Sequence, residues 1–437
     1  MNTYRARIWS LRRTSSIPLL QTTRFQRGEN RRVITTFAFA FQTGINAPRF
    51  ARGASISGLS GSLSSNRQIG RSRPIIMAPP RPDLEKQYMT TKAAKKIAEP
   101  RPSASILLIS PQNQILLLHR VRTSSSFPSA HVFPGGNLAP SDGHIPAPED
   151  KDRHVDGRSY RVGAIRECFE ESGILLARRR DGGGLLEVED SVREQGRRDV
   201  HEGKIGFEKW VEGVGGVVDI ESLHPFTRWI TPPNLPKRFT TQMYIYFLPL
   251  TQDPTSSISN STTITESVIP TPTSDGGLEH TAALFAPCST WLSQARKNEI
   301  ILFPPQFYLM HLLAPFLTPP SPSPSSSPPQ LSTTQLQQQR DAVLEFLRGD
   351  GGDGKGITWA DKVMSPIGLL MRKSDGRSVL GLDKPGPELK GSGRGGDESR
   401  VVLVKFRKEG PRDVEVRGRA EVLREEREGG EGRGAKL

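Results

Sequence analysis

The chain is poor in cysteine and in long apolar runs. Its 437 residues include two cysteines, Cys168 and Cys288. Two thiols cannot build a disulfide framework or a zinc-ribbon site, so those classes are excluded and a reducing compartment is indicated. No apolar run approaches the roughly 18 residues of a spanning helix, so we expect no membrane span.

Acidic residues are almost missing from the first 76 positions, which hold thirteen arginines, no lysine and a single acid, Glu29. This leader carries +12 of the net charge of +14, and the other 361 residues are nearly balanced. We therefore expect no nucleic-acid partner. An Arg- and Ser-rich, acid-poor leader is typical of a mitochondrial transit peptide, and a disordered tail or translation from Met77 is the alternative.

Turn-forming residues are abundant, with 42 glycines and 36 prolines against 35% hydrophobic residues. This balance predicts one core of about 200 to 250 residues with linkers around it. We divide the chain by composition into a leader, a linker, one catalytic domain, a second linker and a C-terminal segment with a helix and a late hairpin. These are residues 1–76, 77–100, 101–316, 317–340 and 341–437. Within them, 253–277, 318–339 and 391–398 are predicted to be disordered insertions.

The central domain alternates short apolar runs with helical periodicity. Strands are predicted at 104–109, 115–118, 227–231, 240–249 and 280–285, and helices at 160–172, 289–298 and 305–313. Gly173 ends the first helix and Pro315 the last. Hairpins mixed with helices predict an α/β (α+β) fold, a mixed sheet sandwiched between helices.

Three acids fall on one side of the helix at 160–172. Glu167, Glu170 and Glu171 stand at positions i, i+3 and i+4, so their carboxylates project together and repel one another. A hard divalent cation with oxygen ligands would relieve that repulsion. Arg166, four residues before Glu170, is placed to pair with and orient a carboxylate. A solvated acidic helix is the alternative interpretation.

A double glycine precedes the acidic helix, in Phe133-Pro134-Gly135-Gly136. Together with Arg166-Glu167-Cys168-Phe169-Glu170-Glu171-Ser172-Gly173-Ile174, it resembles the Nudix box of the Nudix hydrolase superfamily. Arg166 follows Gly136 by 30 residues where the family pattern has 14, which makes 143–158 an insertion. Asp142 stands where the pattern has a glutamate, and the sequence leaves open whether it remains near the helix.

The interrupted box and several flanking segments are similar to the peroxisomal coenzyme A diphosphatases of the moiety X motif 19 type. Those segments include Arg228-Trp229-Ile230-Thr231-Pro232 and Lys237-Arg238-Phe239-Thr240-Thr241, and the likeness covers about residues 101 to 316. The last three residues, Ala435-Lys436-Leu437, resemble a peroxisomal address, so we expect a peroxisomal or mitochondrial location and an import receptor as a partner.

The resemblance implies hydrolysis of a diphosphate with Mg²⁺ or Mn²⁺ held by Glu167, Glu170 and Glu171. It also implies Glu170 as the base that accepts a proton from water, with Glu279 as a second candidate. For coenzyme A, the products are adenosine 3',5'-bisphosphate and (acyl-)4'-phosphopantetheine.

Residues expected to bind the substrate are Gly135 and Gly136 at the turn and Arg120, Arg122, Lys237 and Arg238 for phosphate. ADP-ribose, dinucleotides and nucleotide sugars are alternative substrates. A Nudix-derived binding or scaffold protein without turnover is the alternative from another class.

Overall fold

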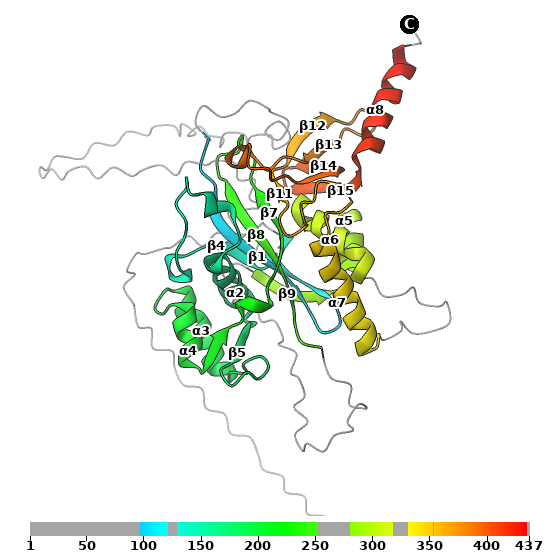
Figure 1. The fold of residues 1–437 in the computed structure, drawn as a ribbon. Coiled ribbons are helices and arrows are strands. Elements are labelled where there is room, and N and C mark those ends of the chain that lie inside the picture. The colour runs from blue at the N-terminus through cyan, green and yellow to red at the C-terminus, as the bar shows by residue number, and fades with distance from the viewer. Residues whose placement is uncertain (1–96, 121–128, 251–279, 318–330, 353, 435–437) are drawn as a thin grey trace, which may run out of the picture. The chain divides into compact units, whose positions relative to one another are not determined.

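The computed structural model describes residues 97–120, 129–250, 280–317, 331–352 and 354–434 (Figure 1). The predicted leader, the insertion 253–277 and the C-terminal tripeptide lie outside these ranges. Arg122 and Glu279 also lie outside them. Within the described ranges, none of the helices combines the length and the apolar character needed to cross a membrane.

The core of the fold is a mixed sheet of nine strands. Its path is β10 (Ile301–Leu302), β3 (Ala130–Val132), β2 (Ile115–Arg120), β1 (Arg101–Ile109), β8 (Phe239–Phe247), β7 (His224–Ile230) and β11 (Val363–Met364), with β4 (Gly135–Asn137) beside β1 and β9 (His280–Ala286) beside β2. β1 runs parallel to β8 and antiparallel to β2, while β7 is antiparallel to β8. The buried aliphatic runs of β1 and β2 explain their central position.

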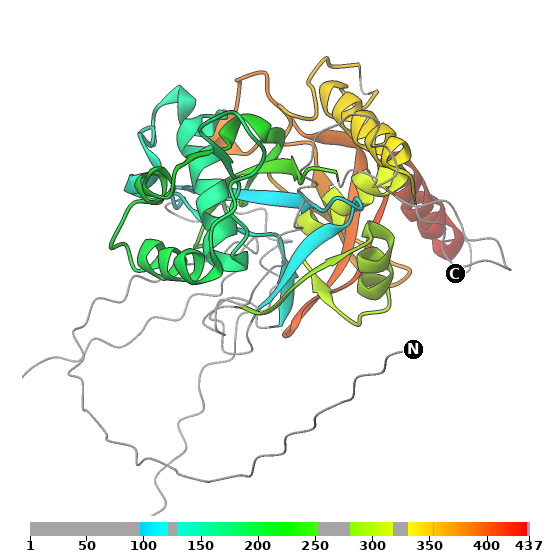
Figure 2. The same cartoon turned by 90° about the horizontal axis from the view of Figure 1, so that it is seen from below.

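Helices cover both sides of this sheet, which confirms the predicted fold class. They are α2 (Arg158–Ser172), α3 (Asp190–His201), α4 (Phe207–Gly213), α5 (Cys288–Arg296), α6 (Pro304–Leu317), α7 (Thr333–Arg348) and α8 (Arg419–Gly434). α2 packs on β1 and β4, with α3 and α4 beyond it. The helices of residues 158–213 and those of 288–348 lie on opposite sides of the sheet (Figure 1; Figure 2). A two-stranded ribbon of β5 (Ala177–Arg179) and β6 (Gly216–Val218) lies near α4.

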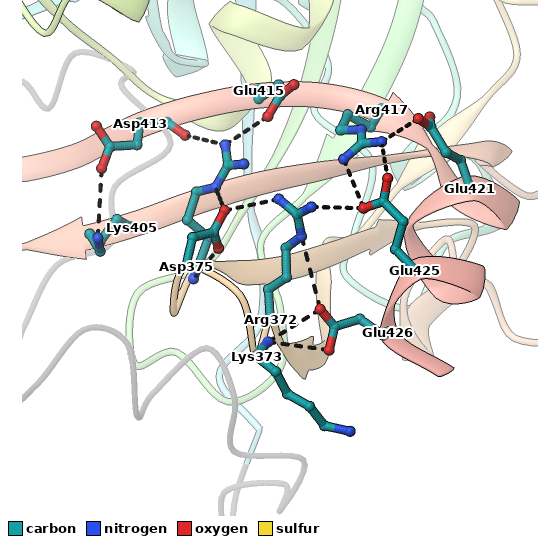
Figure 3. Close-up of polar contacts among 11 residues, drawn as sticks. Arg372, Lys373, Asp375, Lys405, Asp413, Glu415, Arg417, Glu421, Glu425 and Glu426 are labelled. Carbon is teal, nitrogen blue, oxygen red and sulfur yellow. Dashed lines mark hydrogen bonds and ion pairs between the residues drawn. The ribbon is translucent and has the colours of Figure 1, made fainter. Parts of the chain in front are cut away.

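The C-terminal segment forms a four-stranded antiparallel sheet of β12 (Ile367–Met371), β13 (Ser378–Leu382), β14 (Asp397–Arg407) and β15 (Gly410–Gly418). The hairpin of β14 and β15 confirms the predicted late hairpin. α8 is tied to this sheet by an ion-pair network in which Glu425 accepts from Arg372 and Arg417 (Figure 3). β11 precedes these strands but lies in the main sheet, so the segment 341–437 is not confined to its own sheet.

Three predicted boundaries are wrong. α6 runs through Pro315 to Leu317: the proline removes one backbone hydrogen bond, and the buried Leu317 packs in the core at the end of the helix. α7 begins at Thr333, inside the predicted linker 317–340, because Ser332 and Gln335 form a reciprocal capping box. The stretch 391–398 is ordered, since the Gly396 N–H donates to the Asp383 carbonyl at 3.1 Å and β14 begins at Asp397.

Candidate active site

Helix α2 carries the acidic residues and presents two different sides. Ile165, Cys168 and Phe169 are fully buried in the hydrophobic core, as their apolar character requires. The helix ends where Gly173, with a φ of 72°, donates its N–H to the Phe169 carbonyl at 2.9 Å. That left-handed conformation favours glycine and confirms the predicted stop.

The carboxylates of α2 meet the double glycine of β4. The Gly135 N–H donates to Glu171 Oε2 at 2.8 Å. A Cβ atom on Gly136 would lie 2.4 Å from the carboxyl carbon of Glu167, so only glycine leaves room for this side chain. Glu167, Glu170 and Glu171 are 2%, 6% and 5% exposed, which excludes the alternative of a solvated acidic helix.

Arg166 lies at the centre of the cluster. Its Nη1 donates to Glu167 Oε1 at 2.9 Å and to Glu170 Oε1 at 2.8 Å. Its Nε and Nη2 donate to the two oxygens of Asp142 at 2.7 and 2.9 Å. One guanidinium therefore orients three carboxylates, in line with the pairing expected between Arg166 and Glu170.

Asp142 remains beside the helix despite the insertion. It is fully buried, and the Ala139 N–H donates to its Oδ2 at 2.7 Å. The insertion begins after Asp142, the last residue of a short 3-10 helix (Pro140–Asp142), and returns at the start of α2, so its length does not separate Asp142 from Arg166. The question that the sequence left open is answered by this contact.

The cluster has more negative than positive charge in a buried setting. Burial raises the pKa of Glu167. The charge of Arg166 opposes this rise, and repulsion from Glu170 and Asp142 adds to it. Burial acts on Glu170 as well, but its hydrogen bond with His201 and the charge of Arg166 outweigh it and lower the pKa of Glu170. Two neighbouring glutamates thus differ in how readily they hold a proton.

Helix α3 contributes two contacts that sequence reasoning missed. His201 Nδ1 lies 3.1 Å from Glu170 Oε2, and Arg197 Nε donates to the Glu170 carbonyl at 2.7 Å. No motif pointed to these residues, because they lie 27 and 31 positions after Glu170 and their contact with it depends on how α3 packs against α2. The amphipathic spacing of Val192, Gly196 and Val200 was the available signal for this helix.

The side chains of the cluster offer the type of ligand atom that a hard divalent cation prefers. All its ligands are carboxylate oxygens, and Glu167 Oε2 is buried without a hydrogen-bond partner among the described residues. In the same part of the chain, no three His, Cys, Asp or Glu side chains are already gathered closely enough to form a metal cage. The observations therefore support Glu167, Glu170 and Glu171 as candidate ligands by chemistry and position.

Of the cations predicted to bind substrate phosphate, Arg238 is engaged with other groups. Arg120 is buried at the end of β2, and Arg122 is outside the described residues. Arg238 is also buried; it donates to the Thr231 carbonyl at 2.8 Å and pairs with Glu388 of the C-terminal segment. Among the described residues, the side-chain contacts of Arg238 are with Thr231, Ala98 and Glu388 and not with the glutamates of α2. The sequence could not foresee the pairing of Arg238, because Glu388 is 150 residues away.

Comparison with known proteins places this site in a family. Residues 144–313 match the family model described as the NUDT19 Nudix domain. This segment is similar to the Nudix domain of that branch. The match includes Arg166 to Gly173 and begins after Gly136 and Asp142. The resemblance seen in the box residues is therefore confirmed.

Two curated proteins named acyl-coenzyme A diphosphatase NUDT19 are similar to parts of the chain. The Gallus gallus protein is 29% identical over 250 residues, which are 46% of this chain and 61% of the relative. The Homo sapiens protein is 27% identical over 184 residues, 30% of this chain and 47% of the relative. The chain thus spans about half to three fifths of these relatives. A Nudix hydrolase structure from Alicyclobacillus acidocaldarius aligns with 49% of this chain and 91% of its own, at 23% identity and a TM-score of 0.38.

Proposed function

We propose that the protein is a metal-dependent Nudix diphosphatase that hydrolyses the pyrophosphate bond of coenzyme A or acyl-coenzyme A. The products would be adenosine 3',5'-bisphosphate and (acyl-)4'-phosphopantetheine. The observation that carries the proposal is the buried cluster of Asp142, Glu167 and Glu170 around Arg166, held against the double glycine. The names of the relatives support the substrate.

The division of labour follows from the contacts within the cluster. Glu167, Glu170 and Glu171 would hold Mg²⁺ or Mn²⁺, which when bound neutralises charge on the diphosphate and acidifies a bound water. Arg166 orients the carboxylates of Glu167 and Glu170 through its Nη1. Gly135 fixes Glu171 through its backbone N–H.

Glu170 is the proposed general base. The hydrogen bond with His201 and the charge of Arg166 lower its pKa, so it is ionised and able to accept a proton. Its Oε2 faces His201 and its Oε1 faces Arg166, so the direction of the carboxylate is fixed from two sides. The Arg197 contact with the Glu170 carbonyl holds the backbone at the same residue.

The test is a parallel assay of the purified full chain with Mg²⁺ against acetyl-coenzyme A, ADP-ribose and NADH. We expect adenosine 3',5'-bisphosphate to form faster than product from the other two. Preference for ADP-ribose or NADH would move the protein to another Nudix substrate class. Absence of product from all three would favour a binding protein without turnover.

The location is a second proposal and rests on sequence alone. The Arg-rich leader and the C-terminal tripeptide support import into mitochondria and peroxisomes, with the choice set by translation from Met1 or Met77. Fluorescent fusions that leave each end free, expressed from either start, test this. Signal confined to the cytosol for both forms would contradict it.

A further inference from the structure

A second cluster of charged residues lies on the same side of the sheet as the carboxylates, three strands away. Arg228 of β7 pairs with Gln242 of β8, Gln242 pairs with Ala104 of β1, and Ala104 pairs with Gly136 of β4. Gly136 and Arg228 therefore stand in one row, three strand spacings or about 14 Å apart. Paired residues point to the same side of a sheet, and Arg228 accordingly reaches α2, where its guanidinium lies 4.4 Å from the centre of the Tyr160 ring.

Arg228 is buried with unused donors. Its side chain is fully inaccessible, and its Nη1 donates to Thr240 Oγ1 at 3.1 Å. Its Nε and Nη2 have no hydrogen-bond partner among the described residues, and no described carboxylate pairs with it. A buried guanidinium with two free donors is costly unless an acceptor satisfies them.

Two further arginines and one histidine surround the same point. The insertion supplies Arg153 and His154, and His154 Nδ1 lies 2.9 Å from the same Thr240 hydroxyl. The C-terminal segment supplies Arg394, whose Nη1 donates to the His154 carbonyl. Burial and then the charge of Arg228 lower the pKa of Arg394 to about 10, which agrees with two cations close together.

The acids near this cluster do not balance it. Arg153 pairs with Glu99 at 2.8 Å, and the neighbouring Arg238 pairs with Glu388. Within the described structure, the guanidinium of Arg394 donates to the backbone carbonyls of His154 and Asp361. The charge of Asp361 acts on Arg394 at longer range, so Arg228 and Arg394 retain a surplus of positive charge.

A cavity of about 360 Å³ lies on the insertion side of the cluster, beside Arg153 and His154. Arg153 and His154 form part of its wall, with Glu99 and Glu388 opposite and already ion-paired. A phosphate group would take up only a small part of that volume. Guanidinium groups are the side chains best suited to such an anion, because their planar N–H groups match its oxygens.

We propose that Arg228 and Arg394, with Arg153 and His154 at the cavity wall, bind a phosphate-type anion, either a phosphomonoester of the substrate or free phosphate. The assignment to substrate rests on the proposed function, in which coenzyme A carries such a group on its 3' position. The two ends of this row of paired residues would then bind two different phosphate groups of the substrate. The carboxylates of α2 act on the diphosphate, and the arginines of β7 and the C-terminal segment hold a second phosphate away from it.

The first experiment measures binding without turnover. The melting temperature of the full chain is recorded in metal-free buffer with sodium phosphate or with sodium chloride at matched ionic strength. We expect phosphate to raise the melting temperature by a few degrees in the wild type and in the control Arg372→Gln, which changes a partly buried arginine of the C-terminal sheet.

The rise should vanish in Arg394→Gln and in Arg228→Gln. Arg394→Gln decides the matter if Arg228→Gln does not fold, because Arg394 is only partly buried. An equal rise in all variants, or none in the wild type, would overturn the proposal.

The second experiment separates the two sources of phosphate. Arg394→Gln should raise the KM for coenzyme A about tenfold at unchanged kcat, and leave the KM for dephospho-coenzyme A unchanged. If the phosphate-induced melting shift depends on Arg394 but the two KM values respond alike, free phosphate is the occupant and the substrate assignment is overturned. If coenzyme A is not hydrolysed at all, the proposed function fails while the melting shift still tests the anion site.

Discussion

Arg166 satisfies several carboxylates that would otherwise be buried without a counter-charge. Its guanidinium contacts Asp142, Glu167 and Glu170, while Glu171 is held by a backbone N–H of β4. A buried carboxylate costs several kcal/mol unless it is paired, so this single cation lets the cluster fold. It still leaves negative charge in excess. That excess is the physical reason for expecting a cation at the site.

Replacing Glu170 by Gln should abolish turnover without unfolding the protein. Glutamine keeps the shape of the side chain but cannot accept a proton, so we expect the rate to fall about 100-fold to 10,000-fold. The measurement is release of adenosine 3',5'-bisphosphate, with the melting temperature as the check on folding. Glu212→Gln, at an exposed position of α4, is the control and should keep full activity. Comparable rates for the two variants would exclude Glu170 as the base.

The two glycines of β4 should respond differently to substitution by alanine. A Cβ at Gly136 meets the Glu167 carboxylate, the movable end of a side chain, so Gly136→Ala should fold but displace Glu167 and lose activity. A Cβ at Gly135 meets the Ala104 carbonyl at 2.4 Å, and its φ of 156° is one that alanine adopts rarely. We therefore expect Gly135→Ala to lower the midpoint of urea unfolding far more than Gly136→Ala does. Equal losses of stability would show that the Glu167 carboxylate cannot move aside.

At the scale of elements, the helices and strands that could be predicted are those encoded by residues close together in the sequence. α2 was predicted because its apolar spacing lies within the helix and its glycine stop follows it directly, and β1 and β2 because their apolar runs are continuous. α3 was not predicted, since its buried side consists of Gly196, Arg197 and Val200 in a helix rich in charged residues. Its role depends on a long-range contact with α2, which no local pattern encodes. The same holds for the site, where the acids of α2 were predicted but the contact of His201 was not.

Helix α8 is joined to its sheet both by ion pairs and by the buried Val422. The Glu425 carboxylate accepts from Arg372 at 2.7 Å and from Arg417 at 2.6 Å (Figure 3). We expect Glu425→Gln to increase amide hydrogen exchange in residues 419–428 while diphosphatase activity stays unchanged. Exposed ion pairs are screened by salt, so raised ionic strength should have the same effect on the wild type and less on the variant. Unchanged exchange in the variant would mean that Val422, which is fully buried, holds the helix by itself.

At the scale of the whole molecule, three segments far apart in sequence meet around His154. The insertion carries His154 itself, β8 supplies Thr240, and the C-terminal segment supplies Arg394. Composition predicted disorder for the stretch that contains Arg394, because its glycines mask a position fixed by contacts 240 residues away. The folded state therefore depends on how His154 is protonated.

Acid should destabilise the whole fold through His154. Burial and the charges of Arg228, Arg153, Arg394 and Arg238 lower the pKa of His154 from 6.5 to about 4. Above pH 6.5 the imidazole is neutral in the folded and unfolded chains, so its contribution to stability is fully present. As the pH falls from 6.5 towards 4, the unfolded chain binds the proton first, and up to about 3 kcal/mol of stability is lost.

Urea unfolding at a series of pH values between 7 and 4 measures this loss, and His154→Gln provides the reference. Glutamine cannot titrate, so the free energy of unfolding of the variant should fall less steeply with acid than that of the wild type. His131, whose pKa is also lowered to about 4 by burial and by His119, titrates in both proteins and cancels in the comparison. Parallel curves would mean that His154 accepts its proton in the folded state at an ordinary pH. The arginines would then have to lie farther from the imidazole than the contacts of Arg394 and Thr240 with His154 allow.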